Sequence, residues 1–231
     1  MTMIKMNFAV EGKAATMLNG LNLGHIHFSG VGNSKSNPMV DKIIDEACQK
    51  AIGKFKGKDA TLDPTIKGVR LFFSRLGIDP TRYRPSGEAL IKRVVGGKGV
   101  YRVNAVVDIN NAISLETGCP CGVYDASKLV GDTITLTIGA FGQTYEGIGG
   151  NSVNGEGKIL TADSKGVFGG PTADSKRTCV MPETKEVLML IYHPESAPME
   201  VLVEGIEKAI KHMEAATGAK AEYSDIYSIK W

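Results

Sequence analysis

The stretch RVNAVVDINNAISLETGCPCGVYD, residues 102–125, places an unusual number of polar side chains between two apolar segments. One polar residue precedes the apolar run 105–107, and five more lie between that run and the Gly118-Cys119-Pro120 segment. They are Asn104, Asp108, Asn110, Asn111, Ser114 and Glu116. Asn and Asp favour capped turns, so a capped turn is one interpretation. Five amide or carboxylate groups exceed what one cap needs, and we therefore interpret the stretch as one wall of a binding pocket.

The residues on either side of this stretch predict helices first and strands later. Asn37-Pro38 and Asp63-Pro64 are N-cap and first-turn signals, and they predict helices that end near Gly53 and Gly77. Residues 85–95 predict a third helix. Residues 100–107 and 134–138 are rich in β-branched side chains and predict strands, as does the short apolar run 187–192.

An amphipathic pattern over residues 198–217, followed by Gly218, predicts a last helix. Helices, then strands, then a helix favour the α+β class over a parallel α/β sheet, because the elements do not alternate strictly.

Composition restricts the classes of partner. The 231 residues include 27 basic and 25 acidic side chains, a net charge of +2, whereas a protein that coats nucleic acid is far more basic. Contact with the end of a nucleic acid remains compatible with this charge. The sequence shows no run of about 20 apolar residues and no signal-peptide core, so we expect no membrane span and a cytoplasmic protein.

Motifs for metals and cofactors are weak. Cys119-Pro120-Cys121 lacks the spacing of a zinc site or of a thioredoxin-like pair. His25 and His27 fall on one face of a possible strand, without an evident third ligand, and are more typical of exposed strand residues. No glycine-rich segment fits a phosphate-binding or dinucleotide-binding motif. We expect neither a metal nor a cofactor.

Basic side chains concentrate around the predicted third helix, at Arg82, Arg84, Lys92 and Arg93. A solvated helix face is one interpretation. Contact with RNA phosphates is the other.

Residues 102–125 resemble the tRNA-editing domain of the phenylalanyl-tRNA synthetase β subunit, and the chain is similar to a free-standing relative of that domain. The resemblance rests on a pattern of Asn, Val-Val-Asp, Asn, Glu-x-Gly-x-Pro and Asp, which falls here on Asn104, Val106, Val107, Asp108, Asn111, Glu116, Gly118, Pro120 and Asp125. Residues 166–170 resemble the glycine-rich loop of that family, and residues 84–94 resemble the start of its free-standing members.

The resemblance implies an α+β fold with stacked β-sheets and a helical layer. It implies a single unit over residues 1–231, with an editing-like core at 84–195, a decoration at 1–80, and a C-terminal helix and tail at 196–231. It also implies a pocket formed by the asparagine segment, the Gly-x-Pro turn and the glycine loop. The residues expected there are Asn104, Asn110, Asn111, Ser114, Pro120, Gly122, Gly169 and Gly170.

Two positions depart from the family pattern. Gly122 stands where the synthetase usually has histidine, and Leu190 stands near the place of a glutamate that reads the hydroxyl of a mischarged tyrosine. A buried leucine accepts no hydrogen bond, so a tyrosine hydroxyl would stay unpaired at a cost of about 1–3 kcal/mol. We therefore expect a smaller or apolar amino acid as the target.

The pentapeptide TADSK occurs twice, at residues 161–165 and 172–176. We interpret the first copy as a turn into the glycine loop. The second leads into Arg177-Thr178, so Asp174, Arg177 and Thr178 offer a carboxylate, a cation and a hydroxyl to a ligand. A plain surface turn is the alternative.

Three functions follow as hypotheses. The first is a free-standing protein that binds the aminoacyl end of mischarged tRNA and hydrolyses its ester, with Asn110 and Asn111 orienting the substrate and the amides of Gly169 and Gly170 stabilising the oxyanion. The second is a tRNA-binding or amino-acid-binding module without hydrolysis. The third is an enzyme that acts on an amino-acid derivative without RNA. The chain is too short to charge tRNA, and nothing in it predicts DNA binding or an oligomeric state.

Overall fold

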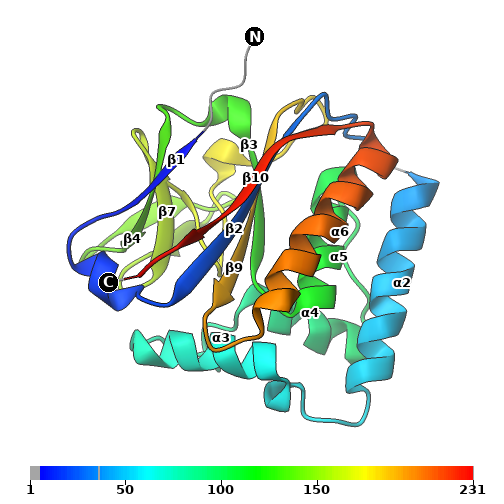
Figure 1. Ribbon diagram of the computed structural model, residues 1–231, viewed down its shortest axis with the longest axis horizontal. Coiled ribbons are helices and arrows are strands. Elements are labelled where there is room, and N and C mark those ends of the chain that lie inside the picture. Colours follow the sequence, from blue (N-terminus) through cyan, green and yellow to red (C-terminus); the bar gives the residue numbers. More distant parts are fainter. Residues whose placement is uncertain (1–5, 36, 231) are drawn as a thin grey trace.

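Two four-stranded sheets pack face to face, and helices cover the outer face of one of them (Figure 1). This computed structural model describes residues 6–35 and 37–230. The strand orders are β1-β4-β7-β8 in the first sheet and β10-β2-β9-β3 in the second, and β5 and β6 form a separate hairpin. The strands are β1 (Asn7–Val10), β2 (Leu21–Ser29), β3 (Cys121–Asp125), β4 (Thr133–Ile138), β5 (Thr144–Glu146), β6 (Ser152–Asn154), β7 (Ile159–Asp163), β8 (Gly166–Gly169), β9 (Val187–Pro194) and β10 (Lys220–Ser228). The predicted α+β class with stacked sheets and a helical layer is confirmed.

The helices are α1 (Lys13–Met17), α2 (Pro38–Phe55), α3 (Pro64–Arg75), α4 (Ser86–Val95), α5 (Ala105–Thr117) and α6 (Met199–Thr217). Helices α2 and α3 begin where the sequence predicts caps. The Asn37 side chain accepts the N–H groups of Met39 and Val40, and Asp63 caps α3 in the same way. In the described ranges, no helix is long and apolar enough to cross a membrane.

Strand β9 separates two hydrophobic cores. Val187, Met189 and Ile191 contribute to the core shared with α5 and α6, whereas Leu188, Leu190 and Tyr192 contribute to the core between the sheets. Because successive strand residues point to opposite faces, a strand covered on both sides reads as one apolar run. This explains why residues 187–192 were predicted correctly as a buried strand.

The strand predicted at residues 100–107 is wrong. Residues 101–104 have no regular structure and Ala105 begins α5, because the Asn104 side chain accepts the Val107 N–H at 3.0 Å. Asp108 accepts from the Val103 N–H at 2.9 Å and from the Arg102 guanidinium at 2.8 Å. Of the β-branched residues in this range, Val106 and Val107 lie in the helix, with Val106 buried and Val107 partly buried against the same core. Tertiary packing overrides their strand propensity.

Residues from the first 80 positions lie inside both sheets, where the sequence suggested a decoration around the 84–195 core. Strand β1 pairs with β4, and β2 lies between β10 and β9. His25 and His27 share a face of β2, as predicted, but both are buried rather than exposed. Burial lowers the pKa of His27 to about 4, so its imidazole is neutral at physiological pH.

Replacing Asn104 with alanine tests whether its side chain stabilises the start of α5. We expect Asn104→Ala to lower the free energy of unfolding by about 1 kcal/mol, because the Val107 N–H loses its acceptor. Asn104→Ser keeps an acceptor and should unfold close to wild type. The measurement is urea denaturation followed by circular dichroism, and equal midpoints for all three proteins would contradict this role of Asn104.

Candidate functional site

A carboxylate–phenol pair joins the two sheets at the end where β3 faces β8. The Tyr124 hydroxyl donates to Asp174 Oδ1 at 2.6 Å, and the Gly170 backbone N–H donates to the same carboxylate. Tyr124 is fully buried on β3, while Asp174 is half-buried in the loop that follows β8. The carboxylate is therefore held in place by donors from both sheets.

Asp174 carries an uncompensated charge. Within residues 6–35 and 37–230, no Lys, Arg or His forms an ion pair with it. Burial raises its pKa to about 6, although the hydrogen bonds from Tyr124 and Gly170 act in the opposite direction. At pH 7 the group is mostly ionised without a countercharge, which is the condition in which a carboxylate attracts a cation or a proton.

Two glycines make room for this pair. A Cβ atom on Gly169 would lie 2.6 Å from both Asp174 Oδ1 and the Tyr124 hydroxyl oxygen. A Cβ atom on Gly122 would also collide with that hydroxyl. The absence of side chains at both positions lets the sheets approach closely enough for the hydrogen bond to form.

A small apolar cavity lies where α3 packs against the sheets, and Tyr192 in its wall belongs to the same core as Tyr124. Pro120, Ile159, Pro171 and Tyr192 line one side, and α3 contributes Val69, Phe72 and Phe73 to the other. The cavity volume of about 10 Å³ is room for about one water molecule. Its walls are apolar, and the hydroxyl of Tyr192 lies 3.5 Å from Thr161 Oγ1, a residue that does not line the cavity.

Both buried phenols stay protonated. Burial raises the pKa of Tyr192, and burial together with the neighbouring Asp174 raises that of Tyr124. Each is therefore a neutral hydrogen-bond donor throughout the physiological pH range. The sequence analysis missed both residues, although Tyr124 follows Gly122 by two positions and so shares its face of the strand.

The predicted residues divide into two groups. One group lies around the Tyr124–Asp174 pair or in the core between the sheets; its members are Pro120, Gly122, Gly169, Gly170, Asp174 and Leu190. The Gly170 N–H interacts with the Asp174 carboxylate, and its role as an oxyanion donor stays a prediction.

The asparagine segment forms the other group and lies behind the second sheet. The α5 side chains Val106, Ile109 and Ile113 pack in the core between the helices and that sheet. Asn110 approaches the Cys121 carbonyl at 3.4 Å, Ser114 donates to the Cys119 carbonyl at 2.7 Å, and half-buried Asn111 lies on the same helix. The expectation that these side chains and Gly169 line one hollow is wrong, because a helix replaces the predicted strand and turn.

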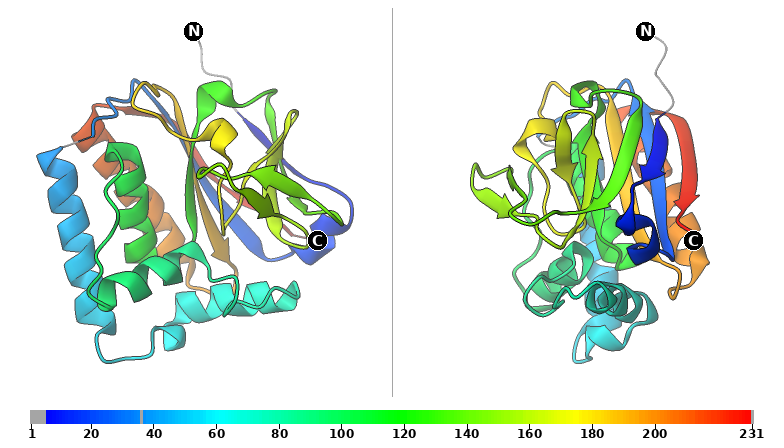
Figure 2. Two further views of the ribbon diagram at one scale, coloured as in Figure 1. Left: turned by 180° about the vertical axis from the view of Figure 1, so that it is seen from behind. Right: turned by 90° about the vertical axis from the view of Figure 1, so that its left-hand side faces the viewer.

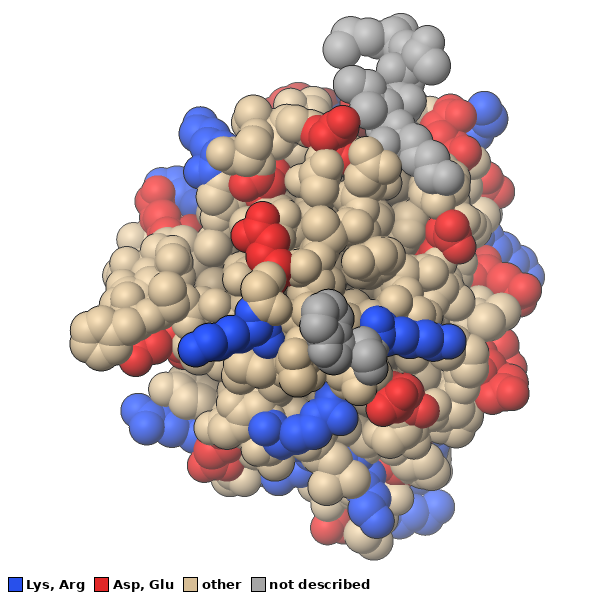
Figure 3. All heavy atoms as spheres, turned by 60° about the vertical axis from the view of Figure 1, so that its left-hand side comes forward, with Lys and Arg blue, Asp and Glu red and all other residues tan. Residues whose placement is uncertain are grey.

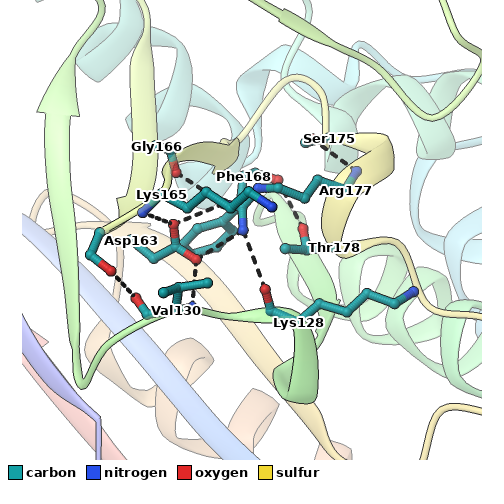
Figure 4. A network of polar contacts seen from close by, with 10 residues as sticks. Lys128, Val130, Asp163, Lys165, Gly166, Phe168, Ser175, Arg177 and Thr178 are labelled. Atoms are coloured by element: carbon teal, nitrogen blue, oxygen red, sulfur yellow. Dashed lines mark hydrogen bonds and ion pairs between the residues drawn. The ribbon is translucent and has the colours of Figure 1, made fainter.

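Arg177 binds a carboxylate of its own chain (Figure 4). Its guanidinium donates to both oxygens of Asp163 at 2.9 and 3.0 Å and to the Gly166 carbonyl at 3.1 Å. The hydroxyl of buried Thr178 donates to the Phe168 carbonyl at 3.3 Å. Both side chains fasten the loop after β8, and contact of either with a ligand stays a prediction.

The two TADSK copies therefore place their aspartates in opposite environments. Burial alone would raise the pKa of Asp163, but Arg177 and the N–H groups of Val130 and Lys165 outweigh burial and lower that pKa below its usual value. Asp174 receives no cation and its pKa rises to about 6. The first copy does form the predicted turn, between β7 and β8.

The basic residues predicted to contact RNA do not share one environment. Arg84 lies 3.3 Å from Glu88, and Arg93 lies over the Tyr101 ring at 3.8 Å. Lys92 lines a groove with Lys58 and Phe55. Arg82 lies over the Tyr83 ring, 5.2 Å from its centroid.

The opposite pKa shifts predict opposite effects of aspartate-to-asparagine replacements on stability. Folding disfavours the ionised form of Asp174, so its penalty builds up between the unfolded pKa of 3.8 and about 6 and is complete above pH 6. The free energy of unfolding of Asp174→Asn should therefore exceed that of wild type by up to about 3 kcal/mol at pH 7 and should equal it at pH 3.

Asp163→Asn is the matched control in the other copy. The lowered pKa of Asp163 means that its charge stabilises the fold above the unfolded pKa and that this contribution is lost as pH falls through the folded pKa. We expect Asp163→Asn to lower the free energy of unfolding by about 3 kcal/mol at pH 7. Urea midpoints between pH 3 and 8 measure both effects, and a shared sign for the two variants would contradict the assignment.

Comparisons with known sequences identify one family. A family model described as "B3/4 domain" matches residues 68–200. The phenylalanine–tRNA ligase β subunit of Gluconobacter oxydans is 35% identical over 78 residues, which cover 33% of this chain and 9% of that protein. The corresponding subunit of Neisseria meningitidis is 33% identical over 98 residues, which cover 42% and 12%. The matched parts thus span about a tenth of these relatives.

A solved structure of an N-terminal fragment of the phenylalanyl-tRNA synthetase β subunit from Pyrococcus horikoshii aligns with 97% of this chain and 55% of that fragment, at a TM-score of 0.44 and 13% identity. The family assignment rests on the sequence model, which covers more than half of the 231 residues. The chain belongs to the B3/4 domain family.

Proposed function

We propose that this protein binds the aminoacyl end of a tRNA at the Tyr124–Asp174 pair, with the Asp174 carboxylate holding the α-ammonium group of the amino acid. The relatives are β subunits of phenylalanine–tRNA ligase, which connects the family with tRNA. The chemistry of the site supplies the rest of the argument.

The uncompensated charge of Asp174 is the observation that carries the proposal. Its pKa of about 6 leaves it ionised at neutral pH, and no described cation pairs with it. An ammonium group at hydrogen-bond distance would balance this charge and recover the cost of burying it. A free carboxylate or a phosphate would be repelled instead, which favours the amino side of an aminoacyl group.

The apolar cavity lined by Pro171 and Tyr192 would receive the amino-acid side chain and restrict its size. A volume of about 10 Å³ between Pro120, Ile159 and Phe72 accepts a group the size of a methyl. The walls are apolar and offer no acceptor for a tyrosine hydroxyl. Small apolar aminoacyl groups, such as alanyl, therefore fit better than aromatic ones.

Hydrolysis of the ester is a second candidate function, and the pKa of Asp174 favours it. A base with a pKa near 6 takes a proton efficiently from a water that attacks the ester carbonyl. Tyr124, which stays protonated, donates to Asp174 and holds this base in place. Asp174 binds the ammonium group in the first function and accepts a proton from water in the second. The two functions therefore require separate measurements.

Binding is tested with a non-hydrolysable 3′-alanylamido-adenosine. Asp174→Asn should weaken its binding by roughly 10- to 100-fold at pH 7.5, because a charged hydrogen bond to the ammonium group is lost. Wild-type affinity should also fall as pH drops through about 6, as the carboxylate becomes protonated. Asp132→Asn, at an exposed aspartate, is the control. Unchanged affinity in Asp174→Asn would refute the proposed binding mode.

Hydrolysis is tested by incubating the protein with tRNAs charged with alanine, phenylalanine or tyrosine. We expect the alanyl ester to be released fastest, and Asp174→Asn to reduce that rate by roughly 100-fold or more. Release at the uncatalysed rate would leave binding as the function. Faster release of tyrosine than of alanine would contradict the assigned cavity.

A further inference from the structure

A groove opens in the helical layer, where the C-terminal end of α2 meets α4 and a single 3-10 turn at Ala60–Leu62. In the left view of Figure 2, this is the place where the lower end of α2 approaches α4. The groove has a volume of about 210 Å³ and shares no lining residue with the cavity at Tyr192. An apolar cavity of about 150 Å³ holds benzene, so the groove has room for a molecule somewhat larger than one ring.

The floor of the groove is apolar. Phe55 and Ile91 are buried members of the core that α2, α4 and α5 share, and half-buried Ala60 and Val95 pack against that core. The groove therefore reaches down to core side chains. A ligand with an apolar body would remove this surface from water, which favours binding.

Two lysines that line the groove lack a countercharge. Neither Lys58 nor Lys92 forms an ion pair or a side-chain hydrogen bond within the described part of the chain. Lys54, four residues before Lys58, does have a partner, since its ammonium lies 2.7 Å from Asp63. The two groove lysines thus differ from their neighbour in being available to an anion.

The two carboxylates that line the groove are already engaged by other groups. Glu88 is buried and accepts hydrogen bonds at 3.0 Å from Arg70 on both oxygens, and Arg84 lies 3.3 Å from it. Asp59 accepts from the N–H of Thr61 at 2.9 Å and from its hydroxyl at 2.8 Å. The charges that remain for a ligand are therefore positive.

This local excess of positive charge is not a property of the whole surface. The face drawn in Figure 3 intersperses acidic and basic side chains, and the net charge of the chain is only +2. The groove consequently favours anions because of where its own lysines and carboxylates lie. Attraction by the charge of the whole protein would be weak.

We propose that this groove binds a small apolar monocarboxylate, of the class of arylacetates and short-chain fatty acids. Its apolar body covers Phe55 and Ile91, and its carboxylate is held by Lys58 and Lys92. A neutral apolar molecule would leave the lysines unpaired, and inorganic phosphate would leave the floor exposed to water. The volume limits the apolar body to about one ring or a chain of about six carbons. This ligand site is separate from Asp174 and goes beyond the proposed function.

The test is a titration of the whole, isotope-labelled chain followed by the NMR signals of its backbone amides. Phenylacetate and hexanoate are the probes; acetate lacks the apolar body, and 2-phenylethanol lacks the charge. We expect both probes to shift the signals of residues 55–61 and 88–95. Acetate and 2-phenylethanol should bind at least about 10-fold more weakly, because each lacks one of the two features that the groove recognises.

Variants assign the two parts of the groove separately. Lys58→Met and Lys92→Met keep an extended side chain and remove the charge, and each should weaken phenylacetate binding by roughly 5-fold, as expected for an exposed ion pair. Val95→Phe fills the groove and should abolish binding. Lys211→Met and Val203→Phe, at exposed positions of α6, are the matched controls for charge and for size, and circular dichroism checks that all variants fold.

Binding of both probes, weaker binding of both comparison molecules and loss only in the groove variants would support the proposal. It would be overturned by equal affinities for phenylacetate and either acetate or 2-phenylethanol, or by wild-type affinity in both lysine variants. Displacement of phenylacetate by equimolar inorganic phosphate would show an anion site without apolar recognition and would also overturn it. So would the absence of shifts in residues 55–61 and 88–95 at about 10 mM of either probe.

Discussion

The hydrogen bond from Tyr124 to Asp174 is the constraint around which this end of the molecule is arranged. It joins a strand of one sheet to a loop of the other at 2.6 Å, and it requires Gly122 and Gly169 to lack side chains. The same close approach buries the Asp174 carboxylate against phenols and apolar groups. The Asp174 side chain therefore combines a negative charge with burial, and the arrangement of Tyr124, Gly122 and Gly169 depends on its position.

Burying an ionised carboxylate without a cation costs stability. The fold offsets this cost elsewhere, since Arg177 fastens the neighbouring loop through two hydrogen bonds to Asp163 and one to the Gly166 carbonyl. The two aspartates occur in identical pentapeptides, yet Asp163 forms an ion pair and Asp174 is buried without a countercharge. An unfavourable ionised group of this kind is typical of functional sites, where a bound ligand can supply the missing interaction.

The site also depends on residues outside the segment that matches the B3/4 model. Leu21, which precedes residues 68–200, lies at the cavity, and β1, β2 and β10 complete the two sheets. Helix α3 supplies Val69, Phe72 and Phe73 as the far wall of the cavity, from a region that the sequence suggested was peripheral. The cavity is consequently a product of the whole chain.

The sequence by itself determined the elements with strong local signals. Asn37-Pro38 and Asp63-Pro64 begin helices because a side-chain acceptor and a proline act within one turn, and residues 187–192 read as a strand because both faces are buried. The family pattern in residues 102–125 was also visible without a structure. Only the tertiary structure decided that Val106 and Val107 are helical, that Asn110 lies behind the sheet and that Asp163 forms an ion pair with Arg177. These outcomes depend on contacts between distant segments, and local propensity contains no information about which partner a buried side chain meets.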